Sequence, residues 1–154
     1  MNRLFQKYGP TMVWLAAAIV LGGSGFAARA AEKGQEIKVR LTGDQEVPPV
    51  KTTGSGTGTI TIAPDKTVSG QITTTGVEGT VAHIHDSMPG QTMCGAKNGP
   101  VIVPLTKGPD NTWSVPAGSK LSDAQYESFK AENLYVNVHS AANKGGEICA
   151  QLKP

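Results

Sequence analysis

The sequence predicts an all-β protein, an antiparallel β-sandwich or barrel with one short helix. Segments in which apolar and polar residues alternate, such as Ile37–Leu41 and Gly58–Ile62, recur between Gly, Pro, Asn and Asp residues that favour turns. No repeated helical segment separates these strands, so the sequence lacks the crossovers that a parallel sheet requires. The expected strands are residues 37–41, 58–62, 68–75, 80–85, 100–105, 112–115, 134–139 and 146–152.

The start of the chain differs in composition from the rest. Arg3 and Lys7 give a positive beginning, residues 11–21 form an apolar run, and residues 28–30, Ala-Arg-Ala, have the small-x-small pattern that signal peptidase recognises. The apolar run is about eleven residues long, whereas a helix that spans a bilayer needs about twenty. We therefore predict a signal peptide over residues 1–30, with an uncleaved N-terminal membrane anchor as the alternative.

Cleavage after Ala30 would leave a single domain over residues 31–154. It would remove three of the 14 basic residues and none of the 12 acidic residues, so the mature chain would be close to neutral. No cluster of Lys and Arg remains to bind nucleic acid. The expected location is periplasmic or secreted, and a retained anchor would hold the domain on the membrane, facing the periplasm.

Two cysteines, Cys94 and Cys149, lie in the part of the chain that we expect to be exported. In an oxidising compartment an even number of cysteines favours a disulfide. Two reduced thiols that bind a metal are the alternative, although the C-x-x-C spacing typical of such ligands is absent. The sequence therefore predicts a Cys94–Cys149 disulfide, which would close a long loop.

The start of one helix is visible in the sequence. Ser122 can cap a helix, and Gln125, three residues later, can bond back to it as the second half of a capping box. Asn133 offers a left-handed residue at the end. We expect a helix over residues 123–132 with a purely structural role.

Three histidines, His83, His85 and His139, are the candidates for chemistry, because the sequence contains no phosphate-binding loop, nucleophile elbow or dinucleotide fingerprint. His83 and His85 are two apart on one expected strand, so both point to the same side. On the strand that contains His139, the same alternation directs Leu134, Val136 and Val138 to the core and His139 outward. If the two strands are neighbours, the imidazoles meet on the outer face, in a metal site open to solvent.

Two other interpretations of the histidines stay open at this point. They can be ordinary polar residues on a solvated face, or one of them can act as a general acid or base, although no carboxylate or nucleophile lies at a telling spacing. Met88 and Met93 follow His85 in the next loop, and thioethers are soft ligands that favour Cu(I). Packing is the commoner role of such methionines.

Four ordered segments carry a family resemblance. They are LTGDQEVPPV at 41–50, AHIH at 82–85, GPVIVPL at 99–105 and NLYVNVHSAANKGGEI at 133–148. These segments resemble the signature blocks of the CHRD (chordin-repeat) domain family. The resemblance covers nearly all of the expected mature chain, and it implies a β-fold in an exported protein without an assigned activity.

A more distant resemblance is to copper/zinc superoxide dismutase. This family has a Greek-key β-barrel, and His83 and His85 look like its first copper-binding pair, with His139 like its later copper ligand. Cys94 and Cys149 resemble its disulfide between a loop and the last strand. The sequence departs from the family because it lacks the histidine that bridges copper and zinc, the zinc ligands and a clear equivalent of the arginine that guides the anion.

The resemblance and the nearby methionines make copper the expected metal, with zinc less favoured. We expect an exported protein that binds copper through His83, His85 and His139 for storage, delivery or protection. One alternative is a structural or interaction subunit that docks on a membrane or exported complex. The other is a copper-only enzyme resembling superoxide dismutase, although a role without catalysis is the more favoured.

Overall fold

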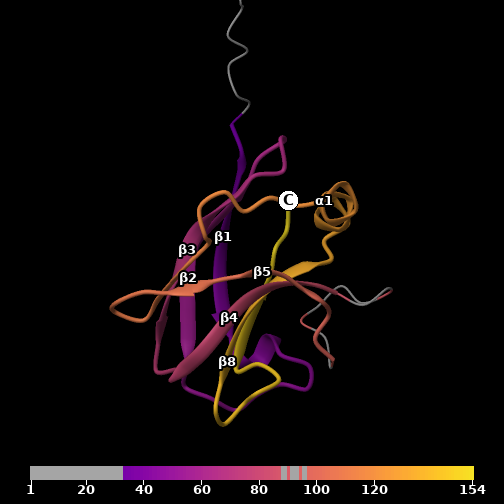
Figure 1. The fold of residues 1–154 in the computed structure, drawn as a ribbon. Helices are drawn as coiled ribbons and strands as arrows, with labels where there is room; N and C mark the ends of the chain where they lie inside the picture. The colour runs from indigo at the N-terminus through magenta and orange to yellow at the C-terminus, as the bar shows by residue number, and fades with distance from the viewer. Residues whose placement is uncertain (1–32, 88–89, 91–93, 95–96) are drawn as a thin grey trace, which may run out of the picture. The chain divides into compact units, whose positions relative to one another are not determined.

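The computed structural model describes residues 33–87, 90, 94 and 97–154 (Figure 1). The expected signal peptide, Met88 and Met93 lie outside these described residues. Within them, no helix is both long enough and apolar enough to cross a membrane. The strands are β1 (Gln35–Thr42), β2 (Ser55–Ile62), β3 (Val68–Thr75), β4 (Gly79–Asp86), β5 (Val101–Pro104), β6 (Thr106–Lys107), β7 (Thr112–Ser114), β8 (Leu134–Ser140) and β9 (Ile148–Gln151), with a 3-10 turn η1 (Gly43–Gln45) and one helix, α1 (Asp123–Lys130).

All the paired strands are antiparallel and belong to one sheet, in the order β5-β4-β8-β9-β1-β2-β3-β7-β6. The chain forms β1, β2 and β3 as successive neighbours, and the last strand, β9, returns to lie beside β1. Strands β4 and β8, which contain the three histidines, pair over most of their length (Figure 1). The predicted all-β antiparallel class with one short helix is confirmed.

One short segment brings the two ends of the sheet together. Val103 in β5 pairs with Ile84 in β4, and the next residue but one, Leu105, donates its main-chain N–H to the carbonyl of Ala82 at 2.9 Å. Directly afterwards, β6 leaves β4 and pairs with β7. The sheet therefore curves into a nearly closed barrel, and the barrel, not the two-sheet sandwich, is the layout that this sequence adopts.

The core of the barrel comes from the apolar positions of the alternating strands. It includes the predicted inward residues of β8, Leu134, Val136 and Val138, all fully buried, and Trp113 from β7. Phe129 on α1 is also buried in this cluster, so the helix packs one face on the barrel. The alternation of β4 and β8 is thus the one that the sequence predicts.

The helix begins as predicted and ends earlier. Ser122 Oγ accepts the N–H of Gln125 at 3.2 Å, and the Gln125 side chain accepts the N–H of Ser122 at 2.8 Å, which completes the capping box. The left-handed residue at the end is Glu132, with φ 59°, and the expectation for Asn133 was wrong. Helix α1 consequently stops at Lys130.

Candidate metal centre

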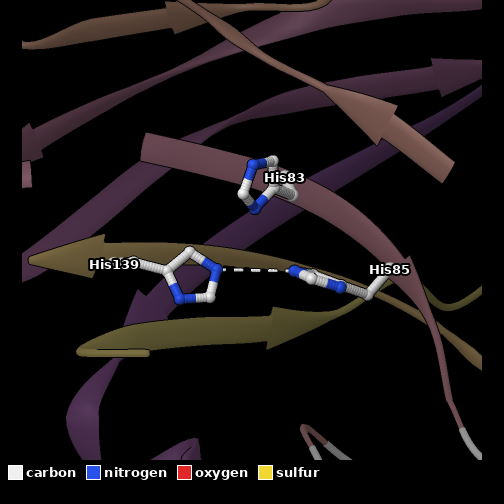
Figure 2. A group of neighbouring side chains, drawn as sticks. All are labelled: His83, His85 and His139. Atoms are coloured by element: carbon white, nitrogen blue, oxygen red, sulfur yellow. Dashed lines mark hydrogen bonds between the residues drawn. The ribbon is translucent and has the colours of Figure 1, made fainter. Parts of the chain in front are cut away.

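The register between β4 and β8 brings the three histidines together. His83 pairs with Asn137, and Val81 pairs with His139, so all these side chains lie on the same, outward side of the sheet. His85 pairs with Tyr135 on that side as well. Figure 2 shows the three imidazoles facing one another from the two strands.

The three rings form a compact triangle. Ring centroids are separated by 5.3 Å between His83 and His85, 5.2 Å between His83 and His139, and 5.6 Å between His85 and His139. One nitrogen from each residue can be chosen so that all three lie within 4.8 Å of one another. The closest contact joins Nε2 of His85 to Nε2 of His139 at 3.4 Å.

Main-chain carbonyls fix the tautomers of two of the rings. Nδ1 of His85 lies 2.9 Å from the carbonyl oxygen of Gly99, and Nδ1 of His139 lies 3.0 Å from that of Lys144. A carbonyl can only accept a hydrogen bond, so each Nδ1 carries the proton and donates it. In the neutral rings, the two Nε2 atoms therefore present lone pairs toward each other.

Burial keeps these rings neutral. Burial is the main cause that lowers the pKa of His85 to about 4. The hydrogen bond to the Gly99 carbonyl raises this pKa, and the charges of His139 and His83 lower it. Burial also lowers the pKa of His139 and that of His83. Near pH 7 the two Nε2 lone pairs of the anchored rings consequently face each other without a proton between them.

Two lone pairs that face each other repel, and a metal ion bound by both Nε2 atoms would remove this repulsion. With N–metal bonds of about 2.0–2.1 Å, an N···N distance of 3.4 Å corresponds to an N–metal–N angle of about 110–115°. Trigonal and tetrahedral sites have angles of this size. The distance between the two Nε2 atoms therefore suits two ligands of one metal ion.

His83 completes the set from a less constrained position. It is partly exposed, and its Nδ1 is buried without a hydrogen-bond partner among the described residues. Figure 2 shows one of its ring nitrogens directed at the space between the other two rings. Since two ligands of one ion lie at most about 4 Å apart, a ring shift of about 1 Å would suffice to bring all three nitrogens onto the ion.

The site is buried, which corrects the expectation of an open outer face. His85 is 2% exposed and His139 is 6% exposed, and every residue of β8 is buried. The outward side of β8 is covered by polar neighbours, because Asn137 lies close enough to bond the side chains of Glu46 and Asn98. The strand alternation was predicted correctly, but alternation cannot show that loops cover the outer side.

Tyr135 supports His85 in two ways, and the sequence analysis missed this role. Its ring stacks on the His85 imidazole, with centroids 5.1 Å apart and planes 13° from parallel. Its hydroxyl accepts the N–H of Gly99 at 3.0 Å and donates to Oδ1 of Asn98 at 3.2 Å. Since Gly99 also accepts the His85 proton, Tyr135 helps to orient the ring. The strand alternation could have indicated this role, because it places Tyr135 on the same outward side as Asn137 and His139.

Residue 99 must be glycine for this arrangement. A Cβ atom there would overlap the main-chain oxygen of Asp86, where the segment after the loop returns against the end of β4. The neighbouring N–H of Asp86 donates to the carbonyl of Pro100 at 3.1 Å, which holds the two segments together. The close approach places the Gly99 carbonyl beside His85.

A buried carboxyl group lies beside the site. Glu46 follows η1 and is 5% exposed, and burial raises its pKa to about 7, while its bond with Asn137 lowers it. Nδ2 of Asn137 reaches Oε2 of Glu46 at 3.5 Å, and Oε1 has no partner among the described residues. No local sequence pattern singles out Glu46, because its burial depends on the distant contact with Asn137.

The disulfide ties Cys94, in the segment between β4 and β5, to the sheet. Cys94 and Cys149 are bonded, as predicted, across a sequence separation of 55 residues. Cys149 in β9 pairs with Asn137, so the bridge starts on the same outward side as the histidines. With Tyr135 the two cysteines form a small buried cluster separate from the main core.

Fold and site together define a small all-β barrel domain with three histidines positioned to hold a metal ion. A comparison with models of protein families matches residues 37–152 to the CHRD domain. The chain belongs to the CHRD family. Comparison with curated proteins gives no significant match, and neither does comparison with solved structures.

Proposed function

We propose that this CHRD protein binds copper outside the cytoplasm, with His83, His85 and His139 as the ligands, for storage, delivery or protection. The observation that carries the proposal is the 3.4 Å contact between Nε2 of His85 and Nε2 of His139, with both Nδ1 atoms committed to carbonyls. Two unprotonated nitrogens held this close repel each other in the absence of a metal ion, and they are suitable ligands when one is bound.

Copper is proposed over zinc because of the donor set and its surroundings. Three neutral imidazoles can hold Cu(I) in a trigonal arrangement, whereas catalytic zinc with three histidines keeps a water in a fourth position. His85 and His139 are 2% and 6% exposed, so a site between them favours an ion that needs no water ligand. Met88 and Met93 follow His85 in the chain and carry the soft thioether donors that Cu(I) favours.

An extracytoplasmic location is part of the proposal. The charged and apolar pattern of residues 1–30 supports a signal peptide that leaves residues 31–154 as the mature domain. The disulfide agrees with this location, because such bonds persist in oxidising compartments. N-terminal sequencing of the protein from its native source tests the cleavage, and an intact Met1 would contradict it.

The direct test measures metal binding by the purified protein. Anaerobic titration with Cu(I) against a chelator of known affinity, and with Cu(II) and Zn(II) separately, should give one Cu(I) per chain bound most tightly. His85→Ala and His139→Ala should each lower the Cu(I) affinity by at least about 100-fold. Gln71→Ala, an exposed substitution on β3, serves as the control. Equal affinities for all four proteins would contradict the proposal.

A second candidate function is docking on an exported or membrane complex. Val81 and Val101 are 44% and 49% exposed, and both lie on the same side of the sheet as the histidines. Exposed apolar side chains gathered in this way favour protein contacts. A partner that stays bound through gentle purification, together with a protein free of metal by elemental analysis, would favour this function over copper binding.

A further inference from the structure

The three histidines are held unequally. His85 and His139 are nearly inaccessible, and each has its Nδ1 fixed by a main-chain carbonyl. His83 is partly exposed, and its Nδ1 is buried without a hydrogen-bond partner among the described residues. Metal-binding histidines whose second nitrogen is hydrogen-bonded are oriented for their ligand, and His83 lacks this restraint.

The surroundings of His83 also differ from those of the other two rings. On β4, Val81 precedes it on the same side and is 44% exposed. On β5, its paired residue is the exposed Pro104, and Val101, paired with His85, is 49% exposed. These three side chains offer no nitrogen, oxygen or sulfur atom that could compete for a metal ion. The accessible side of the site is therefore the side of His83, bordered by apolar groups.

We propose that His83 is the exchange ligand of this site, the residue that detaches to let copper enter and leave, while His85 and His139 retain it. This inference rests on the copper binding proposed above. In the step itself, the bond between copper and the His83 nitrogen breaks and a bond to an incoming donor forms. Copper stays Cu(I) throughout, so the step needs no oxidant or reductant.

The chemistry of the incoming donor follows from the border of the site. A thiolate, thioether or imidazole presented on an apolar surface can approach past Val81 and Val101 without displacing a charged group. A chelator with unsaturated nitrogen donors models such an acceptor. His85 and His139 are buried and are held by hydrogen bonds to main-chain carbonyls. The acceptor must therefore replace His83 as a ligand before it can displace them.

This order of events predicts a particular rate law. The protein is loaded with one equivalent of Cu(I) and mixed without oxygen with excess bicinchoninate in a stopped-flow instrument. For the wild-type protein, the transfer rate should rise with chelator concentration and then reach a plateau, which is set by detachment of His83. For His83→Ala the position is already open, so the rate should be at least about tenfold higher at the plateau concentration and should rise linearly.

Equilibrium affinities separate exchange from simple ligation. His83→Ala should lower the Cu(I) affinity by no more than about tenfold, while His139→Gln and His85→Ala should each lower it by at least about 100-fold. Circular dichroism and thermal unfolding of the metal-free variants establish that they are folded. His139→Gln is included because its amide can still occupy the buried position if the smaller side chain of His85→Ala disturbs the packing.

Two results would overturn the inference while leaving copper binding intact. One is a loss of affinity in His83→Ala as large as that in His139→Gln, and the other is a plateau that persists in His83→Ala. If the wild-type protein itself binds no Cu(I), the proposed function fails, and the inference fails with it. The titration described under the proposed function detects that case before any exchange rate is measured.

Discussion

Nε2 of His85 lies 3.4 Å from Nε2 of His139, and each ring turns its other nitrogen to a main-chain carbonyl. The two residues are 54 positions apart in the chain and come from neighbouring strands, so the barrel itself sets their separation. A site formed in this way does not need to be assembled by the metal. Binding energy is consequently available to stabilise the folded protein.

The first prediction concerns that stabilisation. Cu(I) added without oxygen at about 100 times its dissociation constant should stabilise the folded state by about 2.7 kcal/mol, which for a domain of this size raises the unfolding temperature by roughly 10 °C. Thermal unfolding followed by circular dichroism measures the shift. His139→Ala should unfold at the same temperature with and without copper, and an equal shift in the two proteins would place the metal elsewhere.

The second prediction concerns the support of His85 by Tyr135. Tyr135→Phe keeps the stacked ring and removes the hydroxyl that accepts the Gly99 N–H, leaving a buried donor unpaired. The free energy of unfolding should fall by about 1–3 kcal/mol, and the Cu(I) affinity should fall by about tenfold, because Gly99 no longer holds the His85 proton in place. Chemical denaturation and chelator titration measure the two effects.

Tyr126 supplies the matched control for this change. It lies on α1 and packs against the main core rather than in the cluster of Tyr135, and Tyr126→Phe also removes a tyrosine hydroxyl group. Its effect on the free energy of unfolding should stay within about 0.5 kcal/mol, with no change in Cu(I) affinity. Equal effects of the two substitutions would show that Tyr135 has no specific role at the site.

Most of the barrel follows from local sequence patterns. The alternation in Val68–Thr75 gives β3 with both its ends, and Ser122 with Gln125 gives the start of the helix. These elements depend on side chains within a few residues of one another. The two-residue strand β6 could not be predicted, because it forms only where the segment after β5 meets β7 to close the barrel.

The residues of the candidate site could be predicted from the sequence, but their burial and their hydrogen-bond partners could not. Alternation on two strands placed His83, His85 and His139 on one side, and the register of β4 and β8 gathers them. Their burial depends on contacts between segments far apart in the chain, such as that of Asn137 with Glu46, 91 residues away. The carbonyls that fix the tautomers belong to loops, whose paths no periodic pattern specifies.

The third prediction uses the buried carboxyl group of Glu46. Burial raises its pKa from the ordinary value of 4.5 to about 7 in the folded protein. Below pH 4.5 the group is protonated in both the folded and the unfolded state, and above about pH 7 it is ionised in both. Stability should therefore decrease as the pH rises from 4.5 through 7, by about 3 kcal/mol for this group.

Glu46→Gln should remove this part of the pH dependence, because an amide does not ionise. Relative to the wild-type protein, the variant should gain stability between pH 5 and pH 8, by up to about 3 kcal/mol, measured by denaturation at a series of pH values. Glu78→Gln removes an exposed carboxylate and should follow the wild-type curve. Parallel curves for Glu46→Gln and the wild-type protein would show that Glu46 ionises normally.

The last prediction concerns the Cys94–Cys149 disulfide, which joins the segment between β4 and β5 to β9 beside Asn137. Because the bridge spans 55 residues, its removal should lower the free energy of unfolding by about 4 kcal/mol in the chain-entropy model. The double variant Cys94→Ser, Cys149→Ser avoids a free thiol. Chemical denaturation measures the loss in this variant, and denaturation of the wild-type protein with and without a reducing agent measures it independently.

The same variant separates stability from metal binding. The segment that contains Cys94 leads to Gly99, whose carbonyl orients His85, whereas His139 is oriented by Lys144 from a different loop. Release of the bridge should therefore weaken Cu(I) binding through His85, by about tenfold, in protein that is still folded. The triple variant with Tyr135→Phe should lose less binding free energy than the sum of the losses in the double variant and in Tyr135→Phe, because both changes act on Gly99. Strict additivity would show that the bridge and the hydroxyl act on the site independently.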